Sequence, residues 1–174
     1  MRFYIFLMIL LCFGCSKETD FEPVYDVPDE FQVYVDTFIS EAASRGYTYE
    51  ITNLIVKYDE AVTSPSCGQC NSSAMDAFVQ KIITINPQLQ CWFTDEEKEA
   101  FLIHELGHCV LGRLHDNSVL PNGDPKSMMA ESRLDVYSVC IYQIDDQECD
   151  RRYKRSYYID ELFNESTAVP EWGK

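Results

Sequence analysis

The sequence predicts an α+β fold with a small mixed sheet, one long and largely buried helix, and a helical C-terminal part. Apolar residues recur at helical spacing near the start, in the middle and near the end of the chain. Two short segments rich in β-branched residues are typical of strands. The chain has 174 residues, 46% of them hydrophobic, so it can form one domain with a buried core.

The N-terminal segment predicts export rather than part of the fold. "MRFYIFLMILLCFGC" has one basic residue and then an apolar run shorter than the roughly 20 residues that span a bilayer. We expect a signal peptide over residues 1–14, a flexible tether over 15–28 and a single domain over 29–174. The ending "CFGC" resembles a bacterial lipoprotein signal, although Cys12 stands where leucine is usual. That resemblance implies a lipid on Cys15 and anchoring in the cell envelope; the alternative is an ordinary secretory signal and a secreted protein.

Four elements are expected before the central helix. Residues 30–45 have helical spacing and end at an Arg-Gly pair. Residues 49–60 contain an alternating pattern that predicts a strand. Residues 63–76, "TSPSCGQCNSSAMD", have the composition of a loop. Residues 77–88, "AFVQKIITINPQ", predict a second strand that ends at an Asn-Pro pair.

The central helix has a clear start signal. Thr94 or Asp95 can cap it, and Thr94 with Glu97 matches a capping box. Residues 116–132 then predict a polar loop, and residues 147–166 predict a final amphipathic helix. Four side chains of that helix are expected to face the core: Tyr153, Tyr157, Leu162 and Phe163.

Cysteine usage agrees with a location outside the cytoplasm. Besides Cys12 and Cys15, six cysteines remain: Cys67, Cys70, Cys91, Cys109, Cys140 and Cys149. An even number in an exported chain predicts structural disulfides, and the pairing stays open. The C-x-x-C of Cys67 and Cys70 lacks a second half, so a zinc ribbon is disfavoured.

The formal net charge of −15 argues against a nucleic-acid partner, because an acidic surface repels phosphate. We expect a monomer.

The segment "AFLIHELGHCVLGRLHD" suggests a metal site. His104, Glu105 and His108 form H-E-x-x-H inside the predicted helix. Residues four apart lie on one helical face, so both imidazoles can bind one metal ion, and Glu105 can hold a water without being a ligand. The alternative is a helix with unrelated histidines. The apolar flanks disfavour it, because an unpaired histidine or glutamate is costly to bury there.

A catalytic zinc site needs a third protein ligand. His115 comes eleven residues after His104. On a continuous helix it would lie about 16 Å farther along the axis, so the helix must end and the chain must turn back. Gly112 can make that turn, because glycine accepts the left-handed conformation that ends helices.

These residues resemble the metzincin family of zinc peptidases, whose pattern is H-E-x-x-H-x-x-G-x-x-H followed by a Met-turn. This chain has one extra residue between His108 and Gly112. "PKSMMAE" resembles the Met-turn, with Met129 as its methionine and Met128 as the other choice. Residues 82–131 also resemble small metallopeptidase lipoproteins of Bacteroidetes.

The resemblance implies a zinc endopeptidase acting on peptides or proteins. His104, His108 and His115 would bind Zn²⁺, and Glu105 would be the general base. A substrate would lie as an added strand along residues 81–86.

Two alternatives stay open. Glu131, four residues before Asp135, could be the third ligand, as in the thermolysin-like gluzincins. The chain could also be a surface lipoprotein that binds a ligand and keeps zinc only as a structural staple.

Overall fold

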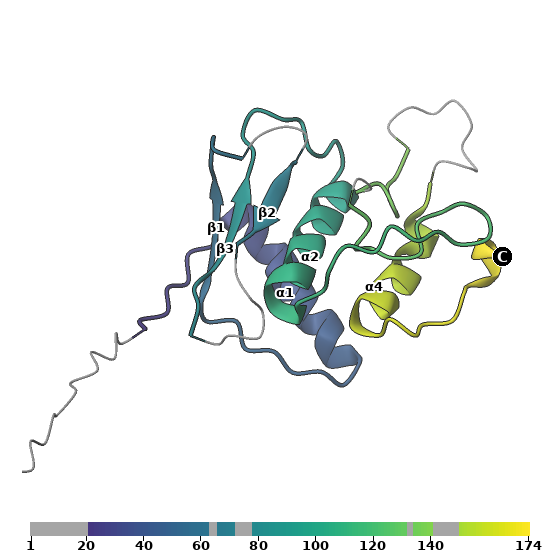
Figure 1. Ribbon diagram of the computed structural model, residues 1–174, viewed down its shortest axis with the longest axis horizontal. Helices are drawn as coiled ribbons and strands as arrows, with labels where there is room; N and C mark the ends of the chain where they lie inside the picture. The colour runs from purple at the N-terminus through teal and green to yellow at the C-terminus, as the bar shows by residue number, and fades with distance from the viewer. Residues whose placement is uncertain (1–20, 63–65, 72–77, 132–133, 141–149) are drawn as a thin grey trace, which may run out of the picture.

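A three-stranded sheet and two long helices form one side of the molecule, and a third helix lies in the C-terminal part (Figure 1). The computed structural model describes residues 21–62, 66–71, 78–131, 134–140 and 150–174. This mixed arrangement confirms the α+β prediction. The signal peptide, Cys15 and Cys149 lie outside the described residues.

The sheet has the order β1-β3-β2. Strand β1 (Leu54–Tyr58) is parallel to β3 (Lys81–Ile85), and β2 (Gly68–Cys70) is antiparallel to it. Because β3 pairs on both sides, it has no free edge for an added strand. The prediction that a substrate strand lies along residues 81–86 is therefore wrong. Both β2 and β3 contact the central helix.

Strand β2 falls where the sequence predicted only a loop. The segment "GQC" has three residues and no apolar alternation, so its sequence carries no strand signal. Two disulfides hold it in place, Cys67–Cys91 and Cys70–Cys109. Cys140 is also disulfide-bonded. These bonds agree with the prediction of structural disulfides.

Helix α1 (Asp29–Ser44) confirms the first predicted helix, and it packs against α2 (Asp95–Leu111). Each contributes an apolar face to one core that also includes β1 and β3. Burying a large apolar side chain stabilises the fold by about 1.5–3 kcal/mol. The fully buried side chains include Phe31, Phe38, Leu54, Ile83, Ile85, Phe101, Leu102 and Leu106.

The end of the predicted tether contacts the domain. The backbone of Asp26 pairs with β1 at Ile55, and the Val24 N–H donates to the Gln80 side chain. No helix in the described ranges is both long and apolar enough to span a bilayer.

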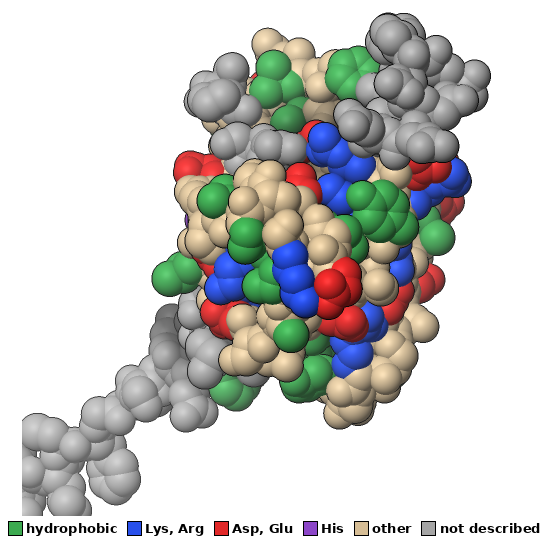
Figure 2. Space-filling model, turned by 90° about the vertical axis from the view of Figure 1, so that its right-hand side faces the viewer, with side chains coloured by type: hydrophobic (Ala, Val, Ile, Leu, Met, Phe, Trp, Pro, Cys, Tyr) green, Lys and Arg blue, Asp and Glu red, His purple; other side chains and the backbone are tan. Residues whose placement is uncertain are grey.

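The C-terminal helix is shorter than the helix predicted over residues 147–166. A 3-10 turn (Arg152–Lys154) precedes α4 (Arg155–Phe163). Tyr157 and Leu162 face the core as expected, and Phe163 packs partly against it. The prediction for Tyr153 is wrong: its side chain is 61% exposed, because it lies in the 3-10 turn, outside the register of α4. On the face in Figure 2, basic and acidic side chains lie next to one another.

Candidate metal centre

Helix α2 positions the H-E-x-x-H residues, and its start agrees with the capping signal. The Thr94 hydroxyl accepts the Glu97 N–H at 3.2 Å, and the Glu97 carboxylate accepts the Phe93 N–H at 2.7 Å. Three acidic residues in the first turn suit the positive end of the helix dipole. The helix then continues without a break through His104, Glu105 and His108.

The helix ends at Gly112, which adopts φ 69° and ψ 19° in the left-handed region. The N–H groups of Gly112 and Arg113 both donate to the Gly107 carbonyl, five and six residues earlier. A regular α-helix joins residues four apart, so this last turn is widened. The widened turn accommodates the extra residue before Gly112, and the chain still turns back there.

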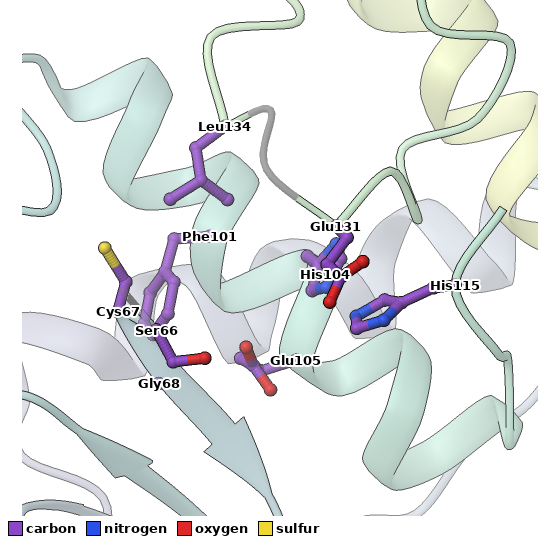
Figure 3. A pocket seen from close by; sticks show the side chains of 9 residues that line it. All are labelled: Ser66, Cys67, Gly68, Phe101, His104, Glu105, His115, Glu131 and Leu134. Carbon is purple, nitrogen blue, oxygen red and sulfur yellow. The ribbon is translucent and has the colours of Figure 1, made fainter. Parts of the chain in front are cut away.

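The three histidines come together after this turn (Figure 3). One nitrogen of each of His104, His108 and His115 lies within 4.8 Å of the others. The Nε2 atoms of His104 and His108 are 3.1 Å apart. The His115 ring centroid lies 5.4 Å from that of His104 and 4.7 Å from that of His108.

Backbone carbonyls orient two of the imidazoles. His104 Nδ1 lies 2.9 Å from the Met128 carbonyl oxygen, and His108 Nδ1 lies 2.6 Å from that of Arg113. A carbonyl only accepts, so each Nδ1 carries a proton and donates it. In the neutral rings both Nε2 atoms then present lone pairs to one another. Two acceptors in contact fit a shared cation, and such carbonyl contacts are usual for metal-binding histidines.

Burial keeps these imidazoles neutral. It lowers the pKa of His104 to about 4, and the neighbouring His108 and His115 lower it further, against the opposing effect of the Met128 hydrogen bond. Burial also lowers the pKa of His108. A metal ligand must be unprotonated, so both rings are ready to bind a cation at neutral pH.

Glu105 lies next to the histidines with an unsatisfied carboxylate. Its side chain is 5% exposed. The Cys70 N–H of β2 donates to the carboxylate, but Oε2 has no hydrogen-bond partner in the described part of the chain. Burial raises the pKa of Glu105 to about 7, and the Cys70 hydrogen bond opposes that shift. The carboxylate lines a cavity of about 290 Å³ with His104 and His115 (Figure 3).

The turn that was predicted as a Met-turn lies beside α2. Met128 provides the carbonyl that orients His104. Met129 is fully buried, and a Cβ on Gly107 would meet its Sδ at 2.7 Å, so the small glycine allows this close approach. The Asp116 N–H donates to the Met129 carbonyl at 3.0 Å, which fixes the segment around His115 against the turn.

Two residues that sequence reasoning missed support both loops of the site. Arg113 donates to the Glu161 carboxylate at 2.6 Å and to the Leu162 carbonyl at 2.7 Å. Glu161, which is 1% exposed, also accepts the Ser127 hydroxyl at 2.8 Å and the Met128 N–H at 3.3 Å. A signal existed: Glu161 is four residues after Tyr157, on the predicted core face, where a charged residue needs a buried partner.

Glu131, the alternative third ligand, lies near the histidines but is not among the side chains that can share one ion with them. Glu131 lines the same cavity from an exposed turn, not from a second helix. No carboxylate of the described residues joins the three histidines within ligand distance of one ion. Asp135 pairs with Arg151 at 3.0 Å, and Asp116 accepts the Ser118 N–H.

Comparisons with known proteins add no assignment to this geometry. No family model matches the chain, and neither a curated protein nor a solved structure matches it.

Proposed function

We propose that this chain is a zinc-dependent endopeptidase of the metzincin type, with His104, His108 and His115 as ligands and Glu105 as general base. One observation carries the proposal: two oriented Nε2 lone pairs and a third imidazole meet beside a buried carboxylate oxygen that has no hydrogen-bond partner among the described residues. A purely structural metal site has no use for such a carboxylate.

The donor set fits zinc. Three imidazole nitrogens with room for one further ligand are typical of catalytic Zn²⁺. Magnesium and calcium prefer oxygen ligands, and no carboxylate of the described residues joins this group. A bound zinc ion would supply Lewis acidity, which lowers the pKa of water and polarises a peptide carbonyl.

Glu105 performs the proton transfers. Its free Oε2 takes a proton from water as the water oxygen attacks the carbonyl carbon. The same carboxyl then gives the proton to the amide nitrogen as the C–N bond breaks. A pKa raised to about 7 by burial suits both roles near neutral pH, and a nearby cation shifts it back towards the carboxylate.

We further propose that a lipid on Cys15 anchors the domain in a bacterial envelope. The disulfides Cys67–Cys91 and Cys70–Cys109 support a location outside the cytoplasm, since disulfides persist in oxidising compartments.

The first test is metal content by mass spectrometry on the full chain, purified in detergent and supplied with zinc. We expect one zinc per chain, lost in His115→Ala and kept in Glu131→Ala. Loss of zinc in Glu131→Ala alone would favour the thermolysin-like ligand set, in which Glu131 replaces His115.

The second test is turnover. Glu105→Gln should keep its zinc and lose peptide cleavage by about 100-fold or more. The control is Glu96→Gln, an equal change in the first turn of the same helix, which should cleave normally. Normal cleavage by Glu105→Gln would contradict the proposed mechanism. One zinc without any cleavage by the wild type would favour a ligand-binding lipoprotein.

A further inference from the structure

A second carboxylate shares the cavity with Glu105. Glu131 follows the turn of Met128 and Met129, and its side chain lies beside His104 and His115 at the wall of the cavity (Figure 3). It does not belong to the group of side chains that can share one ion with the histidines. Its carboxylate lines the cavity, where it can contact a molecule that enters.

Glu131 has a fixed backbone and few side-chain partners among the described residues. Its N–H donates to Asn117 Oδ1 at 2.9 Å, which fixes the backbone. The Asn117 amide approaches Oε2 at 3.5 Å, at the limit of a hydrogen bond. A carboxylate accepts about four hydrogen bonds, and the described residues use only a small part of this capacity. Among the described residues that line the cavity, none is lysine or arginine.

The opposite wall of the cavity is apolar. Phe101 is almost fully buried and lines the cavity with Leu134 and Cys67 (Figure 3). The cavity of about 290 Å³ is at the lower end of ligand pockets, so it suits one side chain or chain end. An apolar wall facing an acidic one suits a group with an aliphatic stem and a cationic head.

We infer that Glu131 is a specificity-determining residue that binds a cationic nitrogen group of the substrate next to the scissile bond. The cationic group is the side chain of a lysine or arginine, or the free amino terminus of the substrate. The net charge of −15 draws such substrates towards the protein from a distance. The inference rests on the proposed peptidase function and adds the substrate class.

The experiment uses the zinc-loaded full chain in detergent and fluorogenic peptides that differ at one position beside the scissile bond. Lysine is compared with methionine, which has a stem of similar length without charge, and with glutamate. Each peptide is made with a free and with an acetylated amino terminus. We expect the lysine peptide, or the free terminus, to give a kcat/KM about tenfold above that of its neutral counterpart.

Two variants test whether Glu131 is the source of the preference for the cationic peptide. Glu131→Gln should lose the tenfold preference, so that its kcat/KM values for the lysine and methionine peptides agree within about twofold. Glu50→Gln removes the same charge at an exposed position outside this cavity and should keep the preference. Zinc content and thermal unfolding of each variant show whether it is folded. A preference that survives in Glu131→Gln, or no preference in the wild type, would overturn the inference.

Two further readouts separate this inference from the proposed function. Cleavage confined to the first residue of free peptides would keep the role of Glu131 and replace the endopeptidase by an aminopeptidase. If the wild type cleaves nothing, calorimetric binding of the lysine and methionine peptides to Glu105→Gln still measures the preference. Equal binding of both peptides, whether amino-terminally free or acetylated, would then sink the inference.

Discussion

Two buried glutamates in this molecule have opposite surroundings. Glu161 of α4 is 1% exposed and accepts from Arg113, from the Ser127 hydroxyl and from the Met128 N–H. Glu105 of α2 is 5% exposed and accepts the Cys70 N–H, and among the described residues one of its oxygens has no partner. Glu105 lies beside the histidines, whereas Glu161 contacts Arg113 and Met128, whose carbonyls orient His108 and His104.

The difference in hydrogen-bond partners distinguishes a glutamate that supports the structure from one that is available for chemistry. A buried carboxylate with all its partners holds loops in place, because removing it leaves a charge and several donors unsatisfied. A buried carboxylate without its full set of partners costs stability, and a fold keeps such a group where it does something else. The first kind of glutamate orients the histidines through Arg113 and Met128, and the second faces the cavity.

The largest effect is expected from Glu161→Ala. It leaves Arg113 buried without its ion partner, so the free energy of unfolding should fall by about 3–5 kcal/mol in urea titrations. The zinc affinity of the full chain should fall too, because the carbonyls that orient His104 and His108 belong to this network.

The control for this prediction is Glu165→Ala. Glu165 contacts the same guanidinium at 3.5 Å but is 75% exposed, so its loss should cost well under about 1 kcal/mol. Equal losses in the two variants would contradict the role given to the buried pair.

The next effect concerns the strand beside Glu105. Replacing Cys70 and Cys109 by serine removes a cross-link over 39 residues, and replacing Cys67 and Cys91 removes one over 24. Loop entropy predicts similar losses for the two double variants, about 4 and about 3.5 kcal/mol. Only the first pair joins β2 to α2 directly at Cys70, which donates to Glu105.

Urea titration and peptide cleavage, measured on both double variants, test this comparison. We expect comparable stability losses and a larger loss of cleavage when Cys70–Cys109 is absent. Equal activity in the two variants would mean that the Cys70 contact does not position Glu105.

The sequence predicted the parts of the molecule whose signals are local. Helix α2, its cap at Thr94 and its end at Gly112 follow from residues near one another in the chain. The meeting of His104, His108 and His115 follows from one helical turn and one chain reversal. Strand β3 followed from its β-branched residues in the same way.

The parts of the structure that the sequence did not predict depend on contacts between segments that are distant in the chain. Strand β2 has no pattern of its own and is held by cross-links to Cys91 and Cys109. Arg113 and Glu161 are 48 residues apart, and nothing near either residue specifies the other. The burial of Tyr158 in place of Tyr153 depends on where α4 begins, and helix starts without a side-chain cap are poorly marked in sequence.

The smallest effect is expected from Glu105→Gln in chelator-treated protein, and it depends on pH. Burial raises the pKa of Glu105 from 4.5 to about 7 in the folded state. Between these values the unfolded chain ionises this group and the folded chain does not, so wild-type stability falls as pH rises through this window. Glutamine does not titrate, so the variant should gain stability relative to the wild type over the same window.

That relative gain should be absent below pH 4.5, level off above about pH 7 and reach about 3 kcal/mol at most. His104 titrates in both proteins, so its contribution cancels in the difference. Added zinc should reduce the gain, because a nearby cation favours the ionised carboxylate in the wild type. Urea titrations of both proteins from pH 4 to pH 8 measure it. A difference that stays constant with pH would mean that Glu105 is as well satisfied as Glu161, and the contrast between the two glutamates would be lost.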